Sequence, residues 1–541
     1  MATILKGGKI YDGSGREAFL GDVLFDGDRI IRIGADIRPS ESDDVIDISG
    51  LSVAPGFFDA HSHNDWFAIK KEPAKYFEPF IRQGITSFIT GNCGLSATGF
   101  KPDTKFLHTI GGGLFGDDTT GVYPTVTEFL DAIDGNNPCN IAVLVGHCTS
   151  RGGVAGNENR ELTDEEMKEM LGAMEQGLKE GACGLSLGLM YLPGKYAHKS
   201  ELREMAKLCE KYDRPLTVHA RALSKVSLDY PLLGRPHILR AMDELVEVCK
   251  GLKMKFQYSH AIFVGKKTFA CKDELHSIIN RMRDEGIDAQ FDIYNELLGV
   301  SVITVVMPAW FQALTSKQKH SWWNKLKLSV MCKFTIMLLG FDWNNIQIAY
   351  LGEGNEKWEG KSIAQCAREM GKNVVDGYLE LCEMSGYNGR VNMGPYSTPQ
   401  IISWQSRQDN CLYMTDAWVE DHGIQNPAIY DCFPKFLRCS LLGEGDTMPR
   451  TIRKMSGAVA DRFSIKERGY LKEGCYADIC VFDENELKAA TPDREKSFGI
   501  RKVWINGNLV LEDDKINYNL LKTSGRAMKS INYGRTDSQR T

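Results

Sequence analysis

Strand and helix signals alternate through the middle of the chain, and this alternation restricts the fold more than any other feature. A helix is predicted from the capping box of Thr163 and Glu166 to Gly181, and a predicted strand at 183–189 follows. The same order recurs, with predicted helices at about 200–212, 238–252 and 273–284 before predicted strands at 216–218, 255–259 and 288–294. In a chain of 541 residues, such repeats predict an α/β fold with a parallel sheet closed into a (β/α)₈ TIM-like barrel.

Polar residues with metal-binding chemistry follow several of the apolar runs. His219 and His260 end two predicted strands, Asp416 follows another apolar run, and His61 and His63 close the segment Pro55–His63. Alternate side chains of a strand share a face, so His61 and His63 can point into one pocket, although such a pair alone is as common on a surface or in a core. The carboxyl ends of barrel strands carry the active site. We therefore expect these five side chains to meet there, around a metal such as zinc.

The two ends of the chain differ from the middle, because both alternate short β-type runs with turns. Turns such as Asp12–Gly15 and Asp26–Asp28 lie near the start, and similar runs at 477–482 and 503–507 lie near the end. We expect residues 1–56 and 469–541 to fold together into a small β-sandwich domain formed by both termini, with a barrel of residues 57–468 inserted between them.

Composition and charge exclude several classes of partner. The net charge of −6 and the pI near 6.1 predict no basic surface for nucleic acid and no Lys/Arg-rich amphipathic helix for membrane attachment. The most apolar stretch, 329–340, contains Lys333 and is too short to span a bilayer. Fifteen scattered cysteines and a start without a signal-peptide pattern predict reduced thiols in a cytoplasmic protein. The expected partner is a small molecule, with no nucleic acid and no membrane.

Further motifs extend along nearly the whole chain. They are Pro55–His63, Gly91–Gly94, Val145–His147 with Arg151, Gly184–Leu189 with Tyr191, His219–Arg221, Ser259–His260, Thr415–Asp416, Phe433–Lys435 and Ala477–Phe482. Each motif alone is weak evidence, whereas their order and spacing together are specific. With them the chain resembles the amidohydrolase superfamily, and within it the N-acyl-D-amino-acid deacylase, or D-aminoacylase, branch.

The resemblance implies a zinc cofactor. The positions that hold one tightly bound zinc in that branch match Cys93, His219 and His260, and those of a second, weaker site bridged by the same cysteine match His61, His63 and Asp416. Cysteine and histidine suit tetrahedral zinc. Cys93 is alternatively a small buried thiol, but its place between Asn92 and Gly94, after an apolar run, favours a ligand.

The expected reaction is hydrolysis of an amide by a metal-activated water, with Asp416 as general base. The carboxylate of Asp416 accepts the proton of the water and passes it to the leaving nitrogen. Because Ala417-Trp418-Val419 follows, Asp416 has the alternative role of a helix N-cap.

The residues expected to bind substrate depart from the family pattern. The family has a lysine that holds the substrate's α-carboxylate where this chain has Ile262, and Ala428 replaces the arginine of a later His-Pro-Arg motif. Arg221, Tyr294 and Tyr191 remain as candidates to bind the substrate. The expected substrates are N-acyl-D-amino acids or related N-acyl compounds.

Residues 296–345 fit the place where this branch inserts a lid over the barrel mouth. We expect its aromatic side chains either to wall off an acyl pocket or to hold the lid down as core residues; they are Trp310, Phe311, Trp322 and Trp323.

Two other functions stay open. A cyclic-amide hydrolase of the hydantoinase or dihydropyrimidinase type would share the fold and metal, but no strand with a carboxylated lysine is evident. A non-catalytic barrel scaffold is the second alternative, and it would have no need of a complete ligand set. Measurements of metal content and of the hydrolysis of linear and cyclic amides would distinguish the deacylase, the cyclic-amide hydrolase and the scaffold.

Overall fold

A closed parallel barrel forms the centre of the molecule. The computed structural model describes residues 2–111, 115, 121–227, 230–231, 234–312, 314–491 and 496–530. Eight strands follow one another in a parallel sheet: β6 (Phe57–Asp59), β7 (Ile85–Thr90), β8 (Asn140–Gly146), β9 (Gly184–Gly188), β10 (Pro215–His219), β11 (Lys255–Tyr258), β12 (Asp288–Ile293) and β16 (Cys411–Tyr413). The first and last strands meet where the Ala60 amide donates to the Tyr413 carbonyl at 3.3 Å. The predicted barrel is confirmed.

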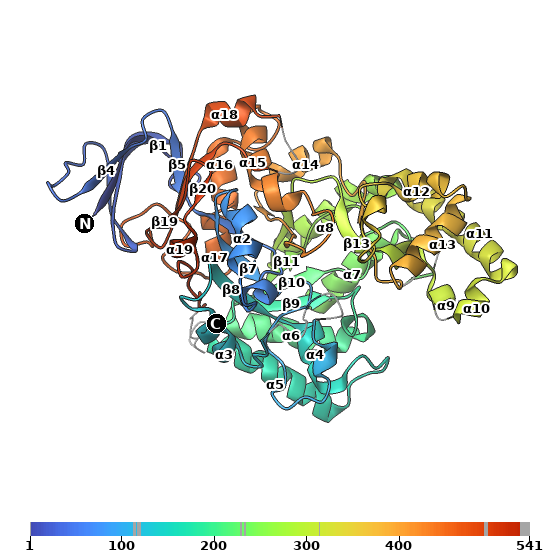
Figure 1. Cartoon of the computed structure of the whole chain (residues 1–541). Coiled ribbons are helices and arrows are strands. Elements are labelled where there is room, and N and C mark those ends of the chain that lie inside the picture. The colour runs from blue at the N-terminus through green and yellow to red at the C-terminus, as the bar shows by residue number, and fades with distance from the viewer. Residues whose placement is uncertain are drawn as a thin grey trace.

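Helices surround these strands (Figure 1). They are α2 (Ala74–Ile81), α3 (Val126–Ile133), α4 (His147–Ala155), α5 (Asp164–Glu180), α6 (Lys199–Tyr212), α7 (His237–Cys249), α8 (Lys272–Asp284), α14 (Pro399–Ser406), α15 (Ala428–Leu441), α16 (Met448–Lys454) and α17 (Gly457–Arg462). The capping box predicted for α5 is present, and the helix ends at Gly181 in the left-handed conformation. The strand–helix repeats predicted between 163 and 294 are thus confirmed.

Strands from both chain ends form a second sheet beside the barrel, on the left of Figure 1. Its nine strands are β1 (Thr3–Ile10), β2 (Phe19–Asp26), β3 (Arg29–Gly34), β4 (Asp44–Asp47), β5 (Ser52–Pro55), β17 (Ile479–Phe482), β18 (Ile500–Ile505), β19 (Asn508–Glu512) and β20 (Lys515–Ile516). The two ends join where β5 pairs with β17, with Val53 opposite Val481. A β-domain formed by both termini is confirmed, whereas its bounds, 1–56 and 469–541, stay a prediction; residues 531–541 lie outside the described residues.

An insertion separates β12 from the last barrel strand and projects at the right of Figure 1. It contains the antiparallel strands β13 (Gly299–Val302), β15 (Arg390–Met393) and β14 (Ile346–Tyr350). Its helices are α9 (Ala309–Gln312), α10 (Ser316–Lys319), α11 (Trp322–Leu339), α12 (Ile363–Glu369) and α13 (Val374–Met384). The predicted lid, 296–345, is the first half of this insertion. No helix in the described part of the chain is long and apolar enough to cross a bilayer.

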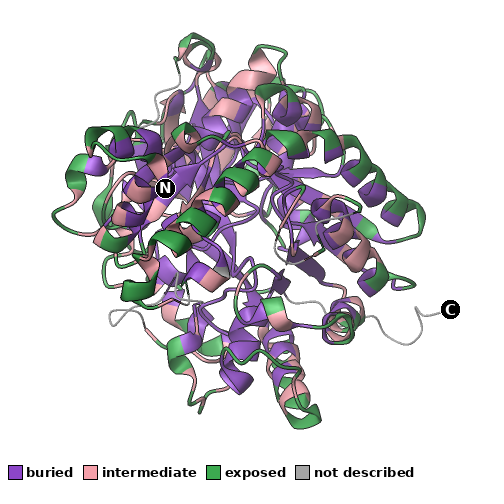
Figure 2. Cartoon of the chain, turned by 90° about the vertical axis from the view of Figure 1, so that its right-hand side faces the viewer, coloured by how far each residue is buried: buried purple, intermediate pink, exposed green. Residues whose placement is uncertain are grey.

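The aromatic residues of the insertion divide into two groups. Phe311 is fully buried and Trp310 packs against the core, as expected for residues that hold the segment down. Trp322 and Trp323 are instead 61% and 59% exposed. The core position stated as one alternative is therefore wrong for these two residues, and the acyl-pocket wall stays a prediction. Figure 2 faces this end of the molecule and shows exposed surface on the outer helices and buried strands within.

Candidate metal centre

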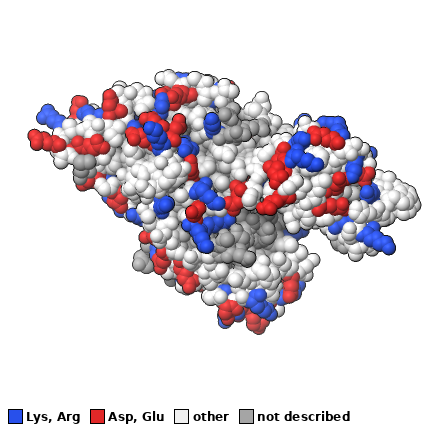
Figure 3. Space-filling model, in the orientation of Figure 1, with Lys and Arg blue, Asp and Glu red and all other residues white. Residues whose placement is uncertain are grey.

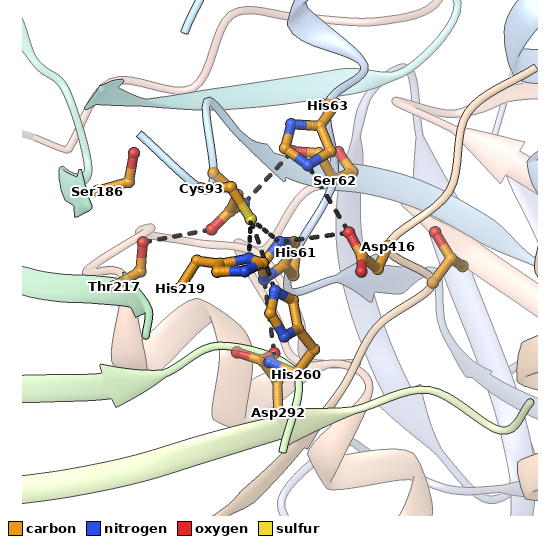
Figure 4. A network of polar contacts seen from close by, with 12 residues as sticks. His61, Ser62, His63, Cys93, Ser186, Thr217, His219, His260, Asp292 and Asp416 are labelled. Carbon is orange, nitrogen blue, oxygen red and sulfur yellow. Dashed lines mark hydrogen bonds and ion pairs between the residues drawn. The ribbon is translucent and has the colours of Figure 1, made fainter. Parts of the chain in front are cut away.

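Six potential ligands meet at the carboxyl ends of the barrel strands, as the strand order requires. His61 and His63 follow β6, Cys93 follows β7, His219 ends β10, His260 follows β11 and Asp416 follows β16. Five strand ends on one rim therefore supply the six side chains, and the segment after β6 supplies two of them. Figure 4 shows them converging on one point.

The sulfur of Cys93 lies at the middle of the cluster. Its Sγ is 3.3 Å from Nε2 of His61, 3.5 Å from Nδ1 of His219 and 3.6 Å from Nε2 of His260. The thiol and the three imidazoles are almost completely buried. A sulfur surrounded by three ring nitrogens is the arrangement in which one small cation can be bound by all of them.

Asp416 forms the second part of the cluster. Its Oδ1 is 3.5 Å from Nε2 of His61 and 3.7 Å from Nε2 of His63. Two sets of potential ligand atoms each lie within 4.8 Å of one another: His61 with Cys93 and His260, and His61 with His63 and Asp416. His61 is common to both sets, whereas the family pattern placed it only with His63 and Asp416.

The donor set fits a metal such as zinc. Four imidazoles, one thiol and one carboxylate combine the nitrogen, sulfur and oxygen donors that zinc accepts, and magnesium or calcium sites would use oxygen alone. Metal ligands must also be deprotonated, which the electrostatics of the cluster favours for Cys93 and Asp416.

Charges within the cluster shift the pKa values of its members. Burial opposes ionisation of the Cys93 thiol, but His61 and His219 outweigh it and hold its pKa well below the ordinary value. Burial likewise raises the pKa of Asp416, and the histidines, His61 first, lower it below the usual carboxyl range. Burial lowers the pKa of His63, but Asp416 and Cys93 raise it to about 9. The cluster thus contains two anionic groups, the thiolate of Cys93 and the carboxylate of Asp416, next to imidazoles.

Three of the six residues have left-handed backbone. The φ angle is 53° at Cys93, 34° at His260 and 47° at Asp416. Side-chain-bearing residues rarely adopt this region, and they persist there only where the surroundings impose it, typically at functional sites. The backbone is therefore bent at these positions in a way that aims the side chains inward.

Buried carboxylates hold the candidate ligands in place. Oδ1 of Asp292 lies 3.5 Å from Nδ1 of His61 and accepts the backbone N–H of His260 at 2.6 Å, and Oδ2 accepts from Gln257 at 2.8 Å. Asp59 accepts backbone N–H groups from His61 at 3.1 Å and Thr415 at 3.0 Å, so it ties β6 to the last strand. Such partners fix the orientation of ligands. Asp292 and Asp59 were not singled out from the sequence.

The loop that carries Cys93 is fixed by the neighbouring strand β9. Ser186 accepts from the Gly94 amide at 3.0 Å and donates to the Gly91 carbonyl at 2.5 Å. Gly188 approaches the same loop so closely that a Cβ there would lie 1.8 Å from the carbonyl oxygen of Cys93. Only glycine fits at this contact.

Asp416 is the most accessible member of the cluster. Its side chain is 23% exposed, whereas the imidazoles of His61 and His63 are 0% and 5% exposed. The chain from Met414 to Glu420 is not helical, so the alternative role of Asp416 as a helix N-cap is wrong. Solvent therefore reaches the cluster on the Asp416 side.

Comparisons with known proteins identify relatives. No family model matches the chain. D-aminoacylase of Alcaligenes xylosoxydans xylosoxydans is 26% identical over 524 residues, 94% of each chain. N-acyl-D-aspartate deacylase of the same organism is 25% identical, over 95% of this chain and 92% of its own length. The chain is a homologue of the D-aminoacylases.

Solved structures agree with this relationship at the level of the fold. A D-aminoacylase crystal structure, described as defining a novel subset of amidohydrolases, superposes with a TM-score of 0.76 at 24% identity and covers 97% of this chain and 99% of its own. N-acyl-D-glutamate deacylase from Bordetella bronchiseptica, complexed with zinc and a phosphonate inhibitor, gives 0.77 at 22% identity over the same shares.

The two tyrosines expected to bind substrate lie beside the cluster. The Tyr191 ring packs edge-on against His219 with centroids 4.7 Å apart. Burial and the charges of Cys93 and Asp416 raise the pKa of Tyr191 well above its ordinary value. Burial and Asp416 do the same to the pKa of Tyr294. Both hydroxyls keep their proton and can donate a hydrogen bond.

In the observed conformation, contacts with other residues keep Arg221 from binding substrate. Its Nε and Nη2 form a paired contact with Glu244, each 3.0 Å long, and Nη1 donates to the Lys195 carbonyl at 2.6 Å. A substrate carboxylate would have to displace Glu244. Ile262, which stands where the family pattern has a lysine, is buried. The next lysines along the chain, Lys266 and Lys267, are exposed.

Proposed function

We propose that the chain is a metal-dependent amidohydrolase that hydrolyses N-acyl-D-amino acids or related N-acyl compounds. The observation that carries the proposal is the cluster in which three imidazoles surround the Cys93 sulfur, with Asp416 on its open side. Relatives along nearly the whole chain that are named as deacylases of D-amino acids support the substrate class.

The metal, zinc by its donor set, would be held by Cys93, His219 and His260. His61, His63 and Asp416 would form a second, weaker position that shares the cysteine. When bound, a divalent metal polarises a carbonyl and acidifies water, which is the chemistry that amide hydrolysis requires.

Asp416 is proposed as the general base and then the general acid. Its Oδ1 faces His61 and His63, and its side chain has the access to solvent that the buried imidazoles lack. In this role the carboxylate takes a proton from the attacking water and delivers it to the leaving nitrogen. Asp292 and Asp59 keep His61 and the end of β16 in place meanwhile.

Substrate binding is assigned to hydroxyl groups more than to cations. Tyr191 and Tyr294 lie at the edge of the cluster and can donate to an acyl or carboxylate oxygen. Arg221 stays in the proposal as a residue that binds substrate only after Glu244 gives way. Because these groups would bind an α-carboxylate only weakly, the proposed substrates include other N-acyl amines.

The test is a matched panel of N-acyl D- and L-amino acids, incubated with zinc-loaded protein while the released amine is measured. Release from the D-isomers supports the proposal. If zinc is bound and no linear amide is cleaved, the proposal fails, and cleavage of a hydantoin or dihydrouracil in the same panel would favour a cyclic-amide hydrolase.

Cys93→Ser and Cys439→Ser form a matched pair of variants. Cys439 lies on α15, half-buried, and takes no part in the cluster. We expect Cys93→Ser to lose zinc and activity and Cys439→Ser to keep both.

A further inference from the structure

Helix α11 exposes an unusual apolar face. Six large side chains on it are between 47% and 61% exposed: Trp322, Trp323, Leu326, Val330, Phe334 and Met337. From Leu326 onward they recur every three or four residues, so they lie along one side of the helix. The rings of Trp322 and Trp323 stack at its start, with centroids 4.0 Å apart.

The opposite side of α11 already anchors the helix. Leu328, Cys332, Ile336 and Leu339 are buried, again at spacings of three and four residues. The outer apolar face is therefore not needed for packing within the chain. Contiguous exposed apolar surface of this kind indicates an interaction site.

Lysines give this segment a charge opposite to that of the chain as a whole. Residues 309–340 contain five lysines and neither Asp nor Glu, although the net charge of the chain is −6. Lys327 and Lys333 are exposed beside the outer face, whereas Lys325 pairs with Asp376 at 2.9 Å. Figure 3 shows uncharged surface at the tip where Figure 1 places α10 and α11, with Lys or Arg side chains and Asp or Glu side chains on the adjoining surface.

We propose that α11 is a docking face for an anionic phospholipid bilayer, with the helix lying in the plane of the surface. Apolar and aromatic side chains beside lysines are the composition of helices that bind at the membrane interface, and tryptophan favours the headgroup region. At 1.5 Å per residue, the 18 residues of α11 give a contact roughly 27 Å long. The helix lies at one end of the molecule, where a flat surface can approach it (Figure 1).

Charge favours a lipid surface over a second copy of the chain. A symmetric pair of α11 helices would bring Lys327 and Lys333 of one copy towards the same residues of the other, without a carboxylate in the segment to offset them. An anionic bilayer offers the opposite charge over the whole patch. The proposal departs from the absence of membrane attachment that composition predicts, because net charge is summed over the whole chain and does not report the charge of this segment.

The experiment is flotation of the full-length protein with vesicles of phosphatidylcholine alone or with 30% phosphatidylserine. We expect binding to the anionic vesicles, weakening as salt is raised, and little binding to the neutral ones. Val330→Glu with Phe334→Glu should lower the bound-to-free ratio at least about a hundredfold. Lys327→Gln with Lys333→Gln should lower it roughly 25-fold, about fivefold for each charge.

The matched control is Phe19→Glu with Leu20→Glu on β2. Both residues are exposed apolar side chains on a strand of the sheet formed by both chain ends, which lies on the opposite side of the barrel from α11 (Figure 1), and this pair changes the net charge by the same amount as the α11 pair. It should leave binding unchanged.

Three results would overturn the proposal. One is no binding to anionic vesicles at low salt, and another is equal loss in the β2 and α11 pairs. The third is a dimer in gel filtration that Val330→Glu with Phe334→Glu dissociates while vesicles bind nothing, which would make a second copy the partner. If circular dichroism shows that Val330→Glu with Phe334→Glu is unfolded, the binding of Lys327→Gln with Lys333→Gln to anionic vesicles tests the proposal instead.

Discussion

Replacing Gly188 by alanine tests whether Cys93 is placed as the structure shows. A Cβ at residue 188 would lie 1.8 Å from the Cys93 carbonyl oxygen, and real contacts of this kind are not shorter than 3.0 Å. The loop or the end of β9 must therefore move by at least about 1.2 Å, and a misplacement of about 1 Å in a catalytic centre can cost a factor of 100 in rate. Overpacking adds a loss of about 1–3 kcal/mol in stability.

Zinc content, thermal melting and the rate of amide hydrolysis are measured on Gly188→Ala and on Gly172→Ala. Gly172, within α5, has no atom within 4 Å of the added Cβ, so its replacement should raise stability by about 0.5–1 kcal/mol and leave metal and rate unchanged. A Gly188→Ala protein with full zinc and normal rate would refute the contact between β9 and the Cys93 loop.

Three further outcomes are expected. Asp416→Asn should keep the tightly bound zinc and lose a factor of about 10²–10⁴ in kcat, and near-normal turnover would remove Asp416 from its role as base. Asp292→Asn should weaken zinc affinity by about 10–100-fold in a chelator competition, since Asp292 accepts the backbone N–H of His260 and lies beside His61; unchanged affinity would contradict this. Burial lowers the pKa of His276 to about 3, below the value of about 6.5 in the unfolded chain, so the unfolded state alone gains this proton below pH 6.5. Stability should therefore fall by up to about 3 kcal/mol between pH 6.5 and pH 4, and His276→Gln should flatten that slope in denaturant titrations.

The barrel and the positions of the clustered side chains were accessible from the sequence because their signals are local. The capping box at Thr163 and the glycine at 181 give the bounds of α5 directly. The clustered side chains follow strands, and parallel strands bring their carboxyl ends to one rim. The position of His219 and His260 after apolar runs was therefore enough to predict that they lie on this rim.

Residues whose role depends on long-range neighbours were not accessible in this way. Asp292 is one of several acids near a strand end, and only the fold brings it to His61. Arg221 matches a family motif, but its pairing with Glu244 on α7 depends on how the two segments pack. The apolar content of α11 does not tell which side of the helix is buried, and only the structure shows which side has neighbours.

The joining of both chain ends in one sheet has a consequence for synthesis on the ribosome. β5 pairs with β1 almost as soon as it emerges, but its other partner, β17, is made about 420 residues later. At roughly 5–20 residues per second, this edge of β5 waits about 20–90 s for its partner. An unpaired apolar strand edge invites association with other chains. A nascent chain that stops before residue 479 therefore keeps an open edge, and completion of the sheet distinguishes finished chains from interrupted ones.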